Sequence, residues 1–267
     1  MVFRRLSRWA IAAPVALALA GLAGCGSGGA GPSAASPPAS GGGGAKQVTV
    51  FAAASLTGTF TELGRRFEAA HPGTTVRFNF GSSATLAQQI TQGAPADVFA
   101  AASPATMKTV TDAGLAGSPT TFTRNRLQIA VPAGGPAKVS GLKDLAAPGV
   151  KVALCAEQVP CGAAAVKALA AAGLTVTPVT LEQDVKATLT KVRLGEVDAA
   201  LVYRTDVLAA GGEVRGIDFP EAGRAVNDYP IATVTGAPAG DLARRFVELV
   251  LSPQGAGVLT KAGFEAP

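Results

Sequence analysis

The chain has 267 residues, of which 48% are hydrophobic, 15% are charged and only 5% are aromatic, with a formal net charge of +5. Its basic residues do not cluster with aromatic residues, which argues against the nucleic-acid-binding class. The abundance of Ala and Gly together with apolar residues is instead typical of a soluble α/β protein packed with small side chains.

The N-terminus has the pattern of an export signal. Arg4, Arg5 and Arg8 precede an uncharged apolar stretch at residues 9–22, and small residues stand before Cys25. The stretch is shorter than the roughly 20 residues that a membrane-spanning helix needs. A cysteine at the cleavage point resembles a bacterial lipobox. We therefore predict a lipoprotein signal peptide at residues 1–24, lipidation of Cys25 and anchoring at the outer face of the cytoplasmic membrane. An ordinary signal peptide and a transmembrane anchor are the alternatives.

Residues 25–45 form a segment of Gly, Ser, Ala and Pro with no charge after the cysteine. Such a composition behaves as a flexible linker and cannot bury an apolar face. We expect a tether here and a folded part at residues 46–267. Removing the three arginines of the signal from the charge of +5 leaves the mature chain at +2.

Strand and helix patterns alternate along the folded part. In the expected helix at residues 56–70, Phe60, Leu63 and Phe67 recur at helical spacing. Ser103 followed by a proline predicts the start of another helix at residue 104. The other expected helices are 85–91, 162–172, 183–194, 239–251 and 253–262, and the expected strands are 47–52, 75–80, 97–101, 127–131, 150–154, 174–179, 197–202 and 231–235. Repeated strand–helix units predict mainly parallel sheets covered by helices on both faces.

Cys155 and Cys161 remain once Cys25 is assigned to lipidation. An even pair in an oxidising compartment predicts a disulfide, and two buried free thiols are the alternative. The single histidine, His71, lies in a sequence typical of a helix-ending turn, which favours a surface turn residue over a metal ligand.

Two strand-to-helix junctions are built from small residues and carry Ser55 and Ser83. A serine there can simply cap the helix. A helix N-terminus, however, also presents unpaired N–H groups and the positive end of the helix dipole to an anion. Because ligands of open α/β sheets bind beyond the carboxyl ends of the strands, two such junctions facing one cleft would form a donor-lined pocket.

The most specific motif of the chain is the Gly-Ala-Pro-Ala-Asp-Val-Phe run at residues 93–99. It stands in order with further motifs at residues 50–57, 80–83, 86, 89–90, 159–162, 182–185, 202–203, 229–230, 251–255 and 263–264. With these motifs the chain resembles the periplasmic molybdate-binding proteins of ABC importers, over nearly all of residues 46–267.

The resemblance implies a two-lobed type II periplasmic solute-binding fold that holds an oxyanion between its lobes. Lobe 1 would comprise residues 46–126 with 231–267 returning to it, and lobe 2 residues 127–230. The implied ligand is molybdate or tungstate. Carried over by position, its donors would be Ser55, Ser83, the backbone N–H groups of Cys161 and Val185, and the Tyr203 hydroxyl. Taken alone, Val185 would be a core residue and Tyr203 an aromatic at a sheet end.

Further expectations follow from the resemblance. The protein would be a monomer without enzymatic activity or cofactor, and its partners would be a cognate ABC permease and its ATPase. Asp97, in the specific motif, is expected to be structural because a carboxylate repels an anion.

Three classes of alternative bear on function: a binder of another ligand, an enzyme and a sensory module. Among binders of the same fold, a sulfate-binding or other oxyanion-binding protein would also use neutral donors, whereas a ferric-ion binder needs more phenolates or carboxylates than are present here, where the two tyrosines are well separated in sequence. An enzyme would need a nucleophile with a base, but the chain has no Gly-x-Ser-x-Gly elbow and a single imidazole. A sensory module would need an additional domain.

Overall fold

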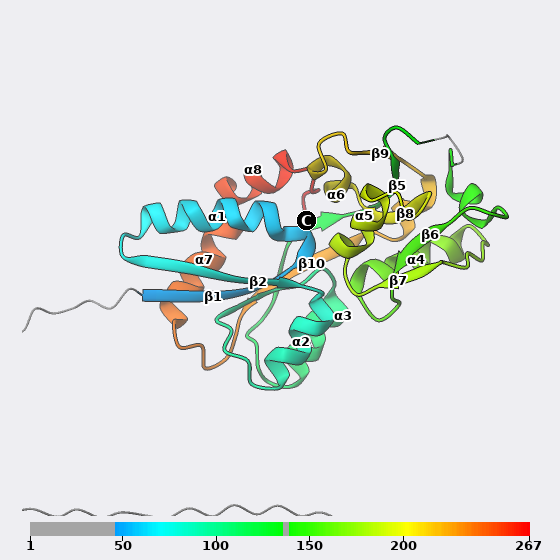
Figure 1. Cartoon of the computed structure of the whole chain (residues 1–267). Coiled ribbons are helices and arrows are strands. Elements are labelled where there is room, and N and C mark those ends of the chain that lie inside the picture. The colour runs from blue at the N-terminus through cyan, green and yellow to red at the C-terminus, as the bar shows by residue number, and fades with distance from the viewer. Residues whose placement is uncertain (1–45, 136–138) are drawn as a thin grey trace, which may run out of the picture. The chain divides into compact units, whose positions relative to one another are not determined.

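The computed structural model describes residues 46–135 and 139–267, which belong to one compact unit containing two five-stranded sheets (Figure 1). The predicted signal peptide, the tether and Cys25 lie outside the described residues. Within the described ranges, no helix has the length and apolar character needed to cross a membrane, and no cluster of three His, Cys, Asp or Glu side chains could hold a metal ion.

The first sheet has the strand order β2-β1-β3-β10-β4. Its strands are β1 (Lys46–Ala53), β2 (Thr74–Gly81), β3 (Val98–Ala100), β4 (Thr120–Asn125) and β10 (Asn227–Thr233). The elements packed around it are the 3-10 turn η1 (Ala54–Leu56) and the helices α1 (Thr57–Ala70), α2 (Ser83–Thr91), α3 (Pro104–Asp112), α7 (Gly240–Leu251) and α8 (Pro253–Lys261).

Alternation along β1 divides the core of this lobe between the two faces of the sheet. Val48 and Val50 are buried against α1, α7 and α8, whereas Phe51 is buried against α2 and α3. Successive side chains of a strand point to opposite faces, so the part of β1 that is covered on both sides, Val50 to Ala53, is a continuous apolar run. Figure 1 shows α1 and α8 on one face and α2 and α3 on the other.

The second sheet has the order β7-β6-β8-β5-β9 and its own hydrophobic core. Its strands are β5 (Leu127–Pro132), β6 (Val152–Cys155), β7 (Thr180–Glu182), β8 (Ala199–Tyr203) and β9 (Val214–Ile217). The helical elements of this lobe are η2 (Leu142–Ala146), α4 (Pro160–Ala171), α5 (Val185–Arg193), α6 (Arg204–Ala209) and η3 (Pro220–Arg224).

The two-lobed α/β fold is confirmed, but both sheets are mixed rather than mainly parallel. β1 pairs in parallel with β2 and β3, while β10 is antiparallel to β3 and β4. In the second sheet β6 is parallel to β7 and β8, while β5 is antiparallel to β8 and β9. β5 and β10 are the strands that enter one sheet directly from the other. Because no strand–helix–strand crossover within the sheet precedes them, nothing forces them to be parallel.

Local differences from the predicted elements have identifiable causes. The strand expected at residues 174–179 does not form, because Pro178 supplies no backbone donor, and β7 begins only at Thr180. Helix α4 begins at Pro160 rather than at residue 162, since proline is well suited to the first helical position. β4, α6 and β9 were not predicted. β4 is separated from β5 by Arg126 alone, so the pair resembles one irregular segment in the sequence.

The turn expected at His71 is present at the end of α1. The His71 ring stacks on Phe67 with a centroid separation of 4.2 Å, and its Nδ1 lies 2.9 Å from the Phe67 carbonyl oxygen. Both contacts are with Phe67 of α1, so His71 acts as the C-cap residue of this helix.

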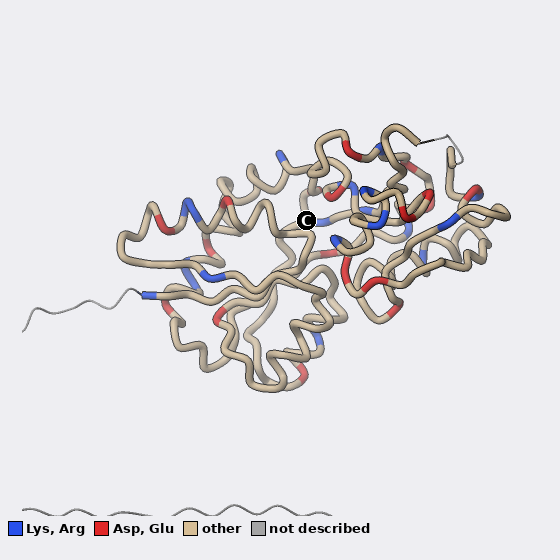
Figure 2. The backbone as a smooth tube through the Cα atoms, in the orientation of Figure 1, with Lys and Arg blue, Asp and Glu red and all other residues tan. Residues whose placement is uncertain are grey.

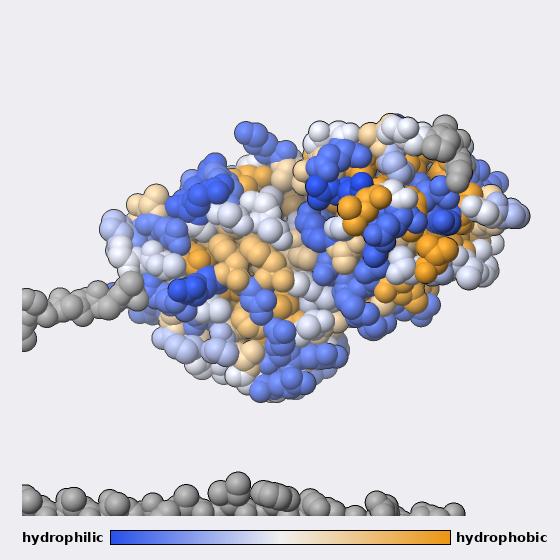
Figure 3. All heavy atoms as spheres, in the orientation of Figure 1, coloured by the Kyte–Doolittle hydropathy of each residue, from blue (hydrophilic) through white to orange (hydrophobic). Residues whose placement is uncertain are grey.

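Charged and apolar surface residues are dispersed. Figure 2 shows Lys and Arg interspersed with Asp and Glu over both lobes. In the view of Figure 3, apolar patches are interrupted by hydrophilic ones. The large hydrophobic side chains at the surface of the described residues are Val166, Val179, Leu181, Leu194, Leu208, Val226 and Leu251.

Candidate functional site

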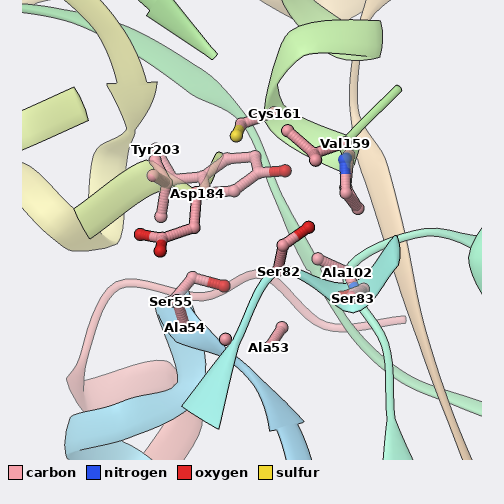
Figure 4. A pocket seen from close by; sticks show the side chains of 13 residues that line it. Ala53, Ala54, Ser55, Ser82, Ser83, Ala102, Val159, Cys161, Asp184 and Tyr203 are labelled. Atoms are coloured by element: carbon pink, nitrogen blue, oxygen red, sulfur yellow. The ribbon is translucent and has the colours of Figure 1, made fainter. Parts of the chain in front are cut away.

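A small cavity is lined by residues of both lobes (Figure 4). Its volume is about 20 Å³, far below the roughly 300–1,000 Å³ typical of pockets for organic ligands. All five residues predicted to bind the ligand line it. The complete lining is Ala53, Ala54, Ser55, Gly81, Ser82, Ser83, Ala102, Val159, Pro160, Cys161, Asp184, Val185 and Tyr203. The space suits one small ion.

Parallel pairing of β1 and β2 brings the two predicted serines to the same edge of the first sheet. Ala53 is in register with Gly81 at the strand ends, and Ser55 and Ser83 follow within η1 and at the start of α2. The Ser83 hydroxyl oxygen accepts a hydrogen bond of 2.9 Å from the backbone N–H of Ala102. Because this bond uses the oxygen as an acceptor, the Ser83 O–H remains able to donate to a ligand.

The Ser55 hydroxyl has a partner that sequence reasoning did not assign to the site. It lies 2.9 Å from the hydroxyl of Tyr229, a buried residue of β10. Burial raises the pKa of Tyr229, so its phenol keeps its proton. When Tyr229 donates to Ser55, the Ser55 proton is free for the cavity. The motif at residues 229–230 belonged to the resemblance, but its tyrosine was not given a role.

Helix starts explain why the backbone amides of Cys161 and Val185 are available. The first amides of a helix have no partner within it. In α4 the first residue is Pro160, which has no N–H, so Cys161 carries the first free amide. In α5 the Asp184 side chain already accepts from the amides of Lys186 and Ala187, at 2.8 and 3.0 Å, which leaves the Val185 amide for another acceptor.

Tyr203 ends β8, and its hydroxyl is held by Asn227. The Asn227 side-chain amide lies 2.7 Å from the Tyr203 hydroxyl oxygen, 2.9 Å from the Ala102 carbonyl oxygen and 3.3 Å from the Pro160 carbonyl oxygen. Asn227 therefore joins residues of both lobes beside the cavity, a role that its sequence context does not reveal. Burial raises the pKa of Tyr203 well above its usual value, so the phenol is a neutral donor.

One further hydroxyl in the lining was not predicted. Ser82 occupies the N-cap position of α2, but its side chain makes no capping bond. Its buried oxygen has no hydrogen-bond partner among the described residues, and Figure 4 shows it pointing into the space between the lobes. The sequence motif contains Ser82 and Ser83 together, and only Ser83 was selected.

The lining also contains a carboxylate that the predicted donor set left out. Asp184 is the N-cap of α5, and its Oδ1 is engaged by two backbone amides of that helix. The positive end of the helix dipole stabilises a carboxylate at this position. Its negative charge nevertheless repels an anion, so the hydrogen bonds from the donors of the cavity must be stronger than this repulsion.

Asp97 lies outside the lining and has the structural role that was expected. Its two carboxylate oxygens accept from the backbone N–H groups of Thr49, at 2.7 Å, and Ala239, at 2.9 Å. The buried side chain thus ties β1 to the start of α7.

The two cysteines of the folded part are joined as a disulfide with a Cα–Cα distance of 5.7 Å. The bond connects the end of β6 to the first turn of α4, and Cys161 lines the cavity. The covalent link therefore restrains the turn that carries the Cys161 amide.

Comparison with known proteins identifies the class. The model of the bacterial extracellular solute-binding protein family matches residues 48–265. The chain is 44% identical over 253 residues to the molybdate-binding protein ModA of Mycobacterium tuberculosis strain H37Rv, covering 94% of this chain and 95% of the relative. The chain belongs to this family of solute-binding proteins, and the predicted resemblance to the molybdate-binding proteins is confirmed.

Two solved structures share the fold. The periplasmic molybdate-binding protein of Azotobacter vinelandii has a TM-score of 0.72 at 22% identity, covering 82% of this chain and 99% of the other. The sulfate-binding protein SubI of M. tuberculosis H37Rv also has a TM-score of 0.72, at 19% identity, covering 83% and 87%. Members of this class bind a solute rather than transform it, which confirms that the chain is not an enzyme and has a ligand rather than a cofactor.

Proposed function

We propose that the protein captures molybdate, and tungstate equally well, outside the cytoplasmic membrane and delivers it to an ABC importer. The observation that carries this proposal is the small interlobe cavity, in which hydroxyls and helix N-termini converge. The 44% identity to ModA supports molybdate as the ligand. We assign Ser55, Ser83 and Tyr203 as hydroxyl donors and Cys161 and Val185 as backbone donors.

The donor set favours dianions that carry no proton. At neutral pH phosphate retains a proton that needs an acceptor, and leaving a polar group unpaired in a closed site costs about 1–3 kcal/mol. Asp184 supplies the one carboxylate of the lining, and its Oδ1 is already engaged by two amides, so only its Oδ2 would be left to accept this proton. Sulfate has no proton but has shorter bonds to oxygen than molybdate, so a rigid shell set for molybdate would stretch its hydrogen bonds.

We expect the full chain to bind molybdate and tungstate with similar affinity, sulfate roughly 100-fold or more weakly, and phosphate least of all. Isothermal titration calorimetry with each of the four anions measures this order. Sulfate binding as tight as molybdate would contradict the ligand assignment and favour the second candidate, a sulfate-binding protein. That candidate is supported by the fold shared with SubI and by the same neutral donors.

We place the lobe boundaries in the connections between the two sheets. Sheet membership supports lobe 1 at residues 46–126 with the C-terminal part returning to it, and lobe 2 at 127–230. β10 pairs within the first sheet from Asn227 onward, which favours a second boundary a few residues before 230. A cognate permease and its ATPase would receive the anion from a monomeric receptor.

We also propose that Cys25 carries a lipid anchor. The support is the charged, apolar and small-residue pattern of residues 1–25. In the native bacterium, Cys25→Ser should release the protein from the membrane fraction or leave it unprocessed, because the thiol that would be alkylated is absent. Immunoblotting of membrane and soluble fractions measures this, with a Ser27→Ala variant as control. Unchanged membrane retention and processing of Cys25→Ser would refute the anchor.

A further inference from the structure

The N-cap of α2 is unlike two other serine N-caps of this protein. Ser103 accepts a capping bond from the Thr106 amide at 3.3 Å, and Ser252 accepts one from the Gly255 amide at 3.2 Å. Ser82 occupies the same position at its helix but makes no such bond. Since serine is chosen at N-caps because its oxygen satisfies a free amide, the Ser82 side chain must serve something else.

The Ser82 hydroxyl lies where an unpaired polar atom is disfavoured. Only 8% of the residue is exposed, and its oxygen has no hydrogen-bond partner among the described residues. Buried side-chain hydroxyls are normally hydrogen-bonded, and an exception calls for a missing partner. The side chain points into the cavity beside Ser55 and opposite Tyr203 (Figure 4), so the missing partner belongs in that space.

We propose that Ser82 donates a hydrogen bond to the bound oxyanion and is a ligand residue in addition to Ser55, Ser83 and Tyr203. The proposal rests on the proposed function and adds a residue to the same site. Ser82 and Ser83 then have different roles. Ser83 accepts from the Ala102 amide and so also supports the fold, whereas the Ser82 hydroxyl has no partner among the described residues and acts on the ligand alone.

The absence of a capping bond at Ser82 also leaves backbone donors of α2 available to the ligand. Because Ser82 does not accept from the first turn of α2, no capping bond occupies the amides of that turn, and the Leu86 amide donates to the Ser82 carbonyl oxygen. An anion at this helix start would receive both the Ser82 hydroxyl and the backbone donors. α2 would thus contribute more donors than a capped helix.

The test compares Ser82→Ala with Ser103→Ala in the full chain. Molybdate is the probe, with tungstate in parallel, and both the dissociation constant and the melting temperature without anion are measured. Ser82→Ala should weaken binding roughly 10- to 100-fold, as expected for loss of a hydrogen bond to a charged group, with the melting temperature unchanged. Ser103→Ala loses a real capping bond, so it should lower the melting temperature and leave the affinity unchanged.

The outcomes separate the two proposals. If wild type binds molybdate or tungstate and Ser82→Ala binds within twofold of it, the Ser82 proposal is wrong and the proposed function stands. If Ser82→Ala instead lowers the melting temperature as Ser103→Ala does, with affinity intact, Ser82 is a structural cap. If wild type binds neither anion, both proposals fail. Restored affinity in Ser82→Thr, which keeps the hydroxyl, would support the ligand role over a change of shape.

Discussion

Gly162→Ala is expected to destabilise the second lobe and weaken anion binding together. A Cβ at this position would lie 1.9 Å from the Ala156 carbonyl oxygen and 2.7 Å from the Cys155 carbonyl oxygen. Both obstacles are backbone atoms in the loop closed by the disulfide, so they cannot move as the end of a side chain can. The start of α4 must therefore shift, and the Cys161 amide moves away from the cavity with it.

We expect the free energy of unfolding to fall by about 3 kcal/mol, the upper part of the usual range for overpacking. Affinity for molybdate should fall roughly tenfold or more, since a displaced donor loses a hydrogen bond to a charged ligand. Denaturant unfolding and calorimetry measure the two effects.

Gly257→Ala is the matched control. Gly257 lies within α8, and an added Cβ there would have nothing within 4 Å. The free energy of unfolding of this control should therefore rise by about 0.5–1 kcal/mol, because alanine has a higher helix propensity than glycine. If Gly162→Ala has the stability and affinity of the wild type, the backbone at the start of α4 accommodates the added Cβ without cost and the prediction is wrong.

Asn227→Asp is expected to abolish binding near neutral pH with almost no change in side-chain shape. The Asn227 amide faces the Tyr203 hydroxyl oxygen and two carbonyl oxygens. A carboxylate there would place a charge among acceptors, accept the Tyr203 proton that the anion needs, and repel the anion itself. We expect at least a roughly 100-fold loss of affinity and a loss of several kcal/mol in stability, the usual effect of an unpaired buried charge.

The effect of pH on this variant has a defined sign. Burial among oxygen atoms raises the pKa of a carboxyl group, so the defect should be full above that raised pKa and should diminish as the pH falls through it. A protonated carboxyl can again donate one hydrogen bond. Calorimetry and thermal unfolding at pH 5 and pH 8 test this. Asp228→Asn, which changes only an exposed pair with Arg124, is the control and should alter stability by at most about 1 kcal/mol. If the affinity of Asn227→Asp for molybdate at pH 8 is within threefold of the wild-type affinity, Asn227 has no role in anion binding.

The sequence by itself determined the features that depend on neighbouring residues. The periodic Phe60, Leu63 and Phe67 predicted α1, and the Ser103–Pro104 step predicted the start of α3. Ser55 and Ser83 follow strands directly, so their place at the sheet edge required only that β1 and β2 be parallel. The resemblance placed Cys161, Val185 and Tyr203, and the structure brings all five residues to one cavity.

Tertiary structure alone decided how the hydroxyls at the cavity are paired. Tyr229 lies 174 positions from Ser55 along the chain, and Asn227 lies 125 from Ala102. Such contacts depend on the return of β10 into the first sheet, which no local pattern encodes. The same return made that sheet mixed rather than mainly parallel. Ser82 and Ser83 are adjacent and chemically identical in the sequence. Only the fold distinguishes them, because it places the Ala102 amide against Ser83 and leaves Ser82 facing the cavity.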